Sequence, residues 1–118
     1  MSQLPLHSQS LSSLCRQLKS GALASLDVTR SMLNRCEEYD VDYQSYARLL
    51  TETALAEAEA CDEARQQGAQ LGVLHGVPIA IKDLLFTAGV ETASGTDVMR
   101  DFKPDYDATV VSRLRAAG

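Results

Sequence analysis

The chain has 118 residues and a net charge of −5, with 45% hydrophobic and 23% charged residues. This length suits one small domain, and this composition excludes a disordered chain. The 16 acidic residues outnumber the 11 basic ones, which argues against the clustered positive charge of a nucleic-acid-binding surface. No apolar run reaches the length of about 18 residues that a membrane span needs, and residues 1–9 lack the pattern of a signal peptide. A cytoplasmic protein is expected.

The cysteines and histidines do not form the spacings of a metal site. Cys15, Cys36 and Cys61 contain no Cys-x-x-Cys pair, and an odd number at this low density argues against a disulfide scaffold. His7 and His75 stand alone, and His75 fits a loop position with a bond to the backbone. The sequence predicts reduced cysteines, no metal and no cofactor.

The first third of the chain has the pattern of two helices. Apolar residues recur at helical spacing from residue 10 to residue 19, and Gly21 supplies the stop. Ser25 is a good N-cap for a second helix that ends near residue 38 or 39. Because the connection is short, residues 1–40 are predicted to form a helical hairpin.

The remainder alternates between strand and helix patterns. Residues 43–50 are rich in aromatic and aliphatic side chains, which predicts a strand, and residues 51–67 predict a helix that Gly68 ends. Residues 77–81 form a short apolar run typical of a buried strand. An irregular stretch with short extended pieces at residues 84–86 and 98–100 is expected next, and Asp107 is predicted to cap a last helix that runs through residue 117. The expected fold class is therefore α/β.

Lys82 is the candidate functional residue because it closes the apolar run 77–81. Burial disfavours the charged ammonium form of a lysine, and a neutral lysine is a base. The simpler alternative is that Lys82 reaches out of the sheet edge and pairs with Asp83. The apolar run alone favours this simpler alternative.

A longer pattern around Lys82 changes that balance. In order, it comprises Gly72-Val-Leu-His-Gly-Val-Pro-Ile-Ala-Ile-Lys-Asp-Leu, Thr87-Ala-Gly-Val, Thr92-Ala-Ser-Gly-Thr96, Asp107-Ala-Thr-Val-Val and Arg113-Leu-Arg-Ala-Ala-Gly118. As a set, these segments resemble the amidase signature family over residues 72–118. One small departure is Thr96, where many members carry serine.

The resemblance implies hydrolysis of an amide C–N bond by a Ser–cis-Ser–Lys triad on an α/β/α fold. Lys82 takes the place of the base. The two serines and the oxyanion-hole amides would come from a later glycine-serine-rich loop, which does not occur in these residues. The chain is therefore expected to be an N-terminal fragment of a single amidase domain and inactive alone. The resemblance also implies that residues 41–118 begin a mixed sheet covered by helices, which is incomplete in this chain. Ser94, in the loop after Lys82, is not expected to replace the missing nucleophile.

Two other functions stay open. The pattern also resembles the A subunit of the glutamyl/aspartyl-tRNA amidotransferase, which would imply glutamine as ammonia donor and partner subunits. A truncated remnant or a small interaction module that uses the helical hairpin is the non-enzymatic alternative. The partner expected for the full-length amidase is a small-molecule amide, with no membrane and no nucleic acid unless the protein is part of an amidotransferase. Homo-oligomer formation and the identity of the substrate are left open.

Overall fold

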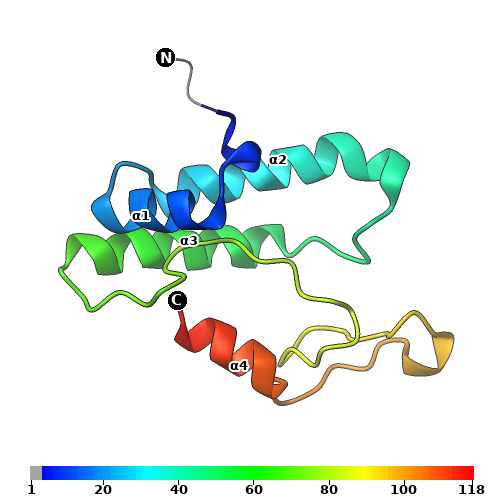
Figure 1. The fold of residues 1–118 in the computed structure, drawn as a ribbon. Helices are drawn as coiled ribbons and strands as arrows, with labels where there is room; N and C mark the ends of the chain where they lie inside the picture. Colours follow the sequence, from blue (N-terminus) through cyan, green and yellow to red (C-terminus); the bar gives the residue numbers. More distant parts are fainter. Residues whose placement is uncertain (1–3) are drawn as a thin grey trace. The chain divides into compact units, whose positions relative to one another are not determined.

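The computed structural model describes residues 4–118, and helices are its regular elements (Figure 1). In chain order these elements are η1 (Leu6–Ser8), α1 (Leu11–Ser20), α2 (Ser25–Tyr43), α3 (Thr51–Gln66), η2 (Asp97–Met99) and α4 (Thr109–Ala116). The described residues divide into two compact units. The first, the helical unit, comprises residues 4–78 and Gly118, and the second, the loop unit, comprises residues 79–117.

The expected α/β fold class is wrong for this part of the chain, because residues 4–118 contain no strand. Residues 77–81 are not helical, but no other described segment pairs with them in a ladder. Ile79 is 46% exposed and Ile81 is 36% exposed. A strand needs a hydrogen-bonded neighbour to form a sheet, and the described residues supply none.

The strand expected at residues 43–50 is also absent, for a local reason. Helix α2 continues to Tyr43, and Gln44 then adopts a left-handed conformation with φ 50°. The carboxylate of Asp40 accepts hydrogen bonds from the amides of Ser45 at 2.6 Å and Tyr46 at 3.3 Å. One side chain thus binds amides that a neighbouring strand would otherwise bind.

Two helices begin and end within one residue of the bounds that the sequence predicts. Helix α1 has Ser10 as its N-cap, where the side chain accepts from the amide of Ser13 at 3.2 Å. It ends at Gly21, whose φ of 78° suits glycine. Helix α3 is followed by Gly68 with φ 74°. These helix patterns are confirmed.

Helix α2 begins with a cap that comes from another helix. Ala24, not Ser25, occupies the N-cap, and it has no capping side chain. Instead the carboxylate of Asp62, on α3, accepts from the amides of Ser25 at 2.8 Å and Leu26 at 3.0 Å. The Ser25 hydroxyl is turned inward and donates to the carbonyl of Gly76 at 2.7 Å. The expectation that Ser25 caps α2 is wrong, because Asp62 already satisfies the amides at this helix end.

Within the helical unit, His75 and Gly76 are held by hydrogen bonds to backbone carbonyls. The Nε2 atom of His75 donates to the carbonyl of Cys61 at 3.0 Å, and His75 is only 6% exposed. The amide of Gly76 donates to the carbonyl of Gly118 at 2.8 Å. His75 therefore has a backbone-bonding role, as expected. The three cysteines are free and half-buried.

None of the helices between residues 4 and 118 combines the length and apolar character that a membrane crossing requires.

Candidate functional site

Lys82 lies in the loop unit, at the end of the extended segment that begins at residue 77. A turn follows it directly, closed by the hydrogen bond from the amide of Leu85 to the carbonyl of Lys82 at 2.9 Å. The side chain is exposed. Within residues 4–118 its Nζ atom has no hydrogen bond or ion pair, so the pairing with Asp83 considered above is not found. The amine is free to approach another group.

Asp83 connects the Lys82 segment to a turn formed by residues 93–96. The carbonyl of Asp83 accepts from the amide of Ser94 at 2.9 Å, and its Oδ1 atom accepts from the amide of Ala93 at 3.3 Å. The turn is closed by the bond from the amide of Thr96 to the carbonyl of Ala93 at 3.0 Å. Asp83 thus binds the backbone of this turn at two adjacent residues.

The turn contains a residue in an uncommon backbone conformation. Ser94 has φ 53° and Gly95 has φ 68°. The left-handed region is open to glycine but is adopted by only a few per cent of other residues. Ser94 is exposed, so its hydroxyl faces solvent beside a backbone that Asp83 holds in place.

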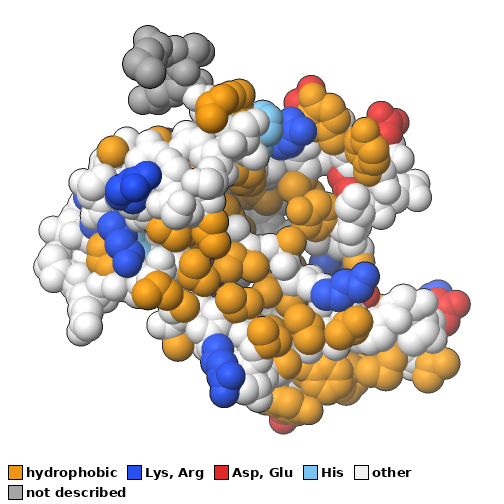
Figure 2. Space-filling view, in the orientation of Figure 1, with side chains coloured by type: hydrophobic (Ala, Val, Ile, Leu, Met, Phe, Trp, Pro, Cys, Tyr) orange, Lys and Arg blue, Asp and Glu red, His pale blue; other side chains and the backbone are white. Residues whose placement is uncertain are grey.

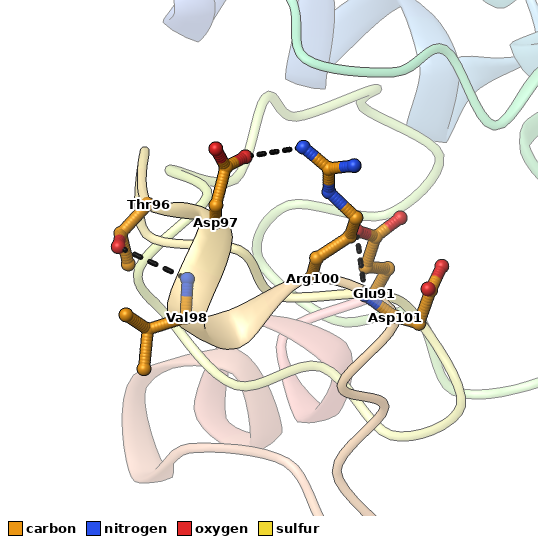
Figure 3. Close-up of polar contacts among 6 residues, drawn as sticks. All are labelled: Glu91, Thr96, Asp97, Val98, Arg100 and Asp101. Carbon is orange, nitrogen blue, oxygen red and sulfur yellow. Dashed lines mark hydrogen bonds and ion pairs between the residues drawn. The ribbon is translucent and has the colours of Figure 1, made fainter.

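Short-range polar contacts stabilise residues 96–100, which form the tip of the loop (Figure 3). The Thr96 hydroxyl accepts from the amide of Val98 at 3.3 Å and so caps η2. Asp97 and Arg100, three residues apart, form an exposed ion pair of 2.5 Å. The extended piece expected at residues 98–100 is therefore a short 3₁₀ helix followed by a turn.

Hydrogen bonds join residues 91–92 to residues 101–102, and these four residues form the neck of the loop. The amide of Asp101 donates to the Glu91 carboxylate at 3.1 Å (Figure 3), and the amide of Thr92 donates to the carbonyl of Phe102 at 2.9 Å. The ring of Phe86 packs against the ring of Phe102 at a centroid distance of 5.5 Å. These contacts give the loop unit a fixed shape with very little regular secondary structure.

Asp107 has a different role from the one that the sequence predicts. Ala108 is the N-cap of α4. The Asp107 carboxylate instead accepts from the amide of Ala88 at 2.8 Å and pairs with Nε of Arg115 at 3.0 Å. It joins residue 88 to α4 within the loop unit, so the capping prediction is wrong.

Nucleophilic groups in the described residues do not contact Lys82. The hydroxyls of Thr87 and Thr92 are buried and lie 3.4 Å from the carbonyls of Leu85 and Val90, to which they donate. In the helical unit, burial is the main cause that raises the pKa of the Cys61 thiol, and nearby carboxylates add to it. A raised pKa keeps the thiol protonated and weakly nucleophilic. The residues between 4 and 118 therefore hold a candidate base without a nucleophile bonded to it.

Sequence reasoning singled out Lys82 but missed the specific contacts of Asp83. It considered Asp83 as a pairing partner of Lys82 and did not identify the amides that it binds. The only available signal was the succession of glycine and hydroxyl residues at positions 92–96, which favours a turn.

Comparison with known proteins identifies relatives of most of the chain. The family model described as Amidase matches residues 27–118. The chain is 52% identical over 101 residues to "Putative amidase AmiD" of Mycobacterium bovis, and the match covers 86% of this chain and 21% of that protein. It is 41% identical over 113 residues to the A subunit of the glutamyl-tRNA(Gln) amidotransferase of Marinobacter nauticus, covering 96% of this chain and 23% of that protein.

A solved structure agrees with these sequence matches. The peptide amidase PAM, in complex with the competitive inhibitor chymostatin, matches with a TM-score of 0.83 and 32% identity over 98% of this chain and 24% of that chain. The chain thus spans about a fifth to a quarter of the length of the relatives it matches.

Proposed function

The chain belongs to the amidase family, and on that premise we propose that Lys82 is the general base of a serine-based amide hydrolysis in the complete protein. The observation that carries this proposal is the position of Lys82 in the most specific motif, within the matched residues 27–118. The absence of an ion-pair partner for Lys82 among residues 4–118 supports it. An ion pair would stabilise the charged form of a lysine, and a base has to be neutral.

In the proposed reaction, the neutral Lys82 amine takes a proton from a bridging serine, which in turn deprotonates the nucleophilic serine. The serine oxygen attacks the amide carbonyl, and backbone amides stabilise the tetrahedral anion. The C–N bond then breaks, and the leaving amine receives the proton through the same relay. Water hydrolyses the acyl-serine and releases the acid. This chain contributes the lysine, and the serines lie outside its 118 residues.

The first test replaces Lys82 by alanine and by arginine in the complete protein. Both variants are expected to lower kcat on a simple aryl amide about 100-fold or more, since proton transfer typically contributes 10²–10⁴-fold. Arginine keeps the charge but cannot give up its proton, so an equally inactive Lys82→Arg supports a base rather than a fixed charge. Lys103→Ala, another exposed lysine of the loop unit, is the control.

Stability separates a chemical effect from a folding defect. Because the Lys82 side chain is exposed, the midpoint of urea unfolding is expected to stay unchanged in both variants. An unchanged kcat in Lys82→Ala would refute the role of the base. The isolated 118-residue chain is expected to hydrolyse no amide, since it lacks the nucleophile.

A second candidate function is that of an amidotransferase A subunit. The 41% identity to such a protein extends over 96% of this chain. This function predicts release of ammonia from glutamine, dependent on partner subunits, with little turnover of aryl amides. Rates on glutamine and on an aryl amide, measured with and without those partners, distinguish the two functions. If neither compound reacts and the reading frame encodes no glycine-serine-rich segment, the non-enzymatic alternative is favoured.

A further inference from the structure

The residue next to the proposed base holds a second segment of the chain beside it. Asp83 uses two acceptors, its carbonyl for the amide of Ser94 at 2.9 Å and its Oδ1 atom for the amide of Ala93 at 3.3 Å. Consecutive Cα atoms are about 3.8 Å apart. The turn formed by residues 93–96 is therefore bonded to the residue that directly follows Lys82, and it lies close to the Lys82 backbone.

The conformation of this turn independently suggests a functional position. Ser94 has φ 53° although it is not glycine, and such conformations cost about 1–3 kcal/mol and cluster at active sites and ligand contacts. They persist only where neighbouring contacts enforce them. Here Asp83 and the bond from Thr96 to Ala93 supply those contacts.

We propose that Asp83 is a positioning residue of the Lys82 site. By binding the amides of Ala93 and Ser94, it fixes the turn at residues 93–96 as the wall beside the base against which the amide substrate is placed. This inference rests on the proposed function of Lys82 and adds a role for two residue positions, 83 and 94. Asp83 acts through the backbone of the turn and takes no proton from the substrate.

The loop unit contains a matched contact for comparison. Glu91 also accepts a backbone amide with its carboxylate, that of Asp101 at 3.1 Å. Both contacts stabilise the same loop, but Glu91 lies at the neck and is not adjacent to Lys82 in the chain. Loss of either contact should lower loop stability, whereas only loss of the Asp83 contact should disturb the base.

The test measures kcat, KM and thermal unfolding of Asp83→Ala, Asp83→Asn and Glu91→Ala in the complete protein, on the aryl amide that Lys82→Ala fails to turn over. Asp83→Ala is expected to lower kcat/KM about tenfold or more through misplacement of the substrate. Asparagine keeps an oxygen acceptor, so Asp83→Asn should recover most of the loss. Glu91→Ala should keep kcat/KM within about twofold of the original protein at temperatures where it is folded.

Two further readouts distinguish positioning from other roles. The acidic limb of the pH–rate profile should keep its position in Asp83→Ala, since a positioning residue does not titrate in the reaction. Hydrogen exchange at the Ala93 amide, which loses its side-chain acceptor, should accelerate in Asp83→Ala and stay unchanged in Glu91→Ala.

Each contrary outcome has a defined meaning. If Lys82→Ala is inactive while Asp83→Ala keeps full kcat/KM, the positioning role is wrong and the general base stands. A loss in Glu91→Ala as large as that in Asp83→Ala would reduce the effect to general loop stability and overturn the proposal. Full activity of Lys82→Ala would overturn both proposals together.

Discussion

The two compact units of the chain maintain their structures by different means. In the helical unit, backbone amides bond within α1, α2 and α3, and a few buried polar side chains, such as Ser25 at 2% exposure, join the elements. In the loop unit, residues 79–108 contain only the short η2, and backbone hydrogen bonds of turns hold them together with side-chain acceptors such as Asp83 and Asp107. The comparison indicates that local helix patterns make the scaffold, while the lysine-bearing loop depends on individual polar contacts.

The helical unit buries more aliphatic side chains than the loop unit does. Leu14, Leu18, Val28 and Ala58 of the helical unit are 7%, 2%, 0% and 4% exposed. In the loop unit Val111 is the buried aliphatic residue among those described. Apolar side chains are common on the surface shown in Figure 2, and the exposed ones of the loop unit include Ile79, Leu84, Val98, Tyr106 and Val110. Polar contacts therefore matter more in the loop unit, and packing matters more in the helical unit.

The largest effect on this comparison is expected from Gly76→Ala in the helical unit. A Cβ atom at Gly76 would lie 2.9 Å from the Ser25 side chain, and φ is already +72°. Backbone strain and overpacking together should cost about 3 kcal/mol or more of unfolding free energy. Urea unfolding of the 118-residue chain measures this loss.

Gly68→Ala provides the matched control. Gly68 has φ +74°, but a Cβ atom there would meet no other atom within 4 Å, so only the backbone contribution of about 1–2 kcal/mol should be lost. Equal losses at Gly76 and Gly68 would show that close packing around Ser25 contributes little to the helical unit.

A smaller effect is expected from Asp62→Ala, which removes the cap of α2. The amides of Ser25 and Leu26 would lose their acceptor, and the loss of a helix cap costs about 1–2 kcal/mol. The neighbouring Glu63 is exposed, so Glu63→Ala should stay within about 0.5 kcal/mol of the original protein. If both substitutions have the same small effect, the link between α2 and α3 does not depend on this carboxylate.

The smallest effect is expected from Arg100→Ala in the loop unit. The ion pair with Asp97 is short but exposed on both sides, and such pairs contribute about 0–1 kcal/mol. The loss of unfolding free energy, measured by urea unfolding, should be about 0–1 kcal/mol, which is smaller than the loss expected for Gly76→Ala. A loss above about 1 kcal/mol would mean that the tip of the loop contributes more to stability than its exposure suggests.

The parts of the fold that sequence predicted correctly are those with local causes. Ser10 and Gly21 mark the ends of α1, and Gly68 follows α3, because caps and stops act within one helical turn. The start of α2 was misread because its cap, Asp62, lies on α3. The strand at residues 77–81 was misread because apolar character shows that a segment can be buried, not that a partner strand is present.

The candidate site was predictable to a similar extent. Lys82 was singled out because its motif is contiguous and specific, and its role stays a prediction. The contact between Asp83 and residues 93 and 94 depends on a loop that returns to its start, and no periodicity records such a return. A burial-based argument about Lys82 also failed, since the residue is exposed in the described part of the chain.

The hydrogen bond from Gly76 to Gly118 determines how much length variation the helical unit tolerates. Residues 4–78 and Gly118 belong to the helical unit, and the bond between Gly76 and Gly118 brings its two parts together. Residues 79–117 therefore form a long insertion whose two ends are held close to each other. The entropy cost of closing such a loop grows only with the logarithm of its length, by about 0.6 kcal/mol per doubling. Insertions and deletions within residues 79–117 should therefore cost the helical unit little stability.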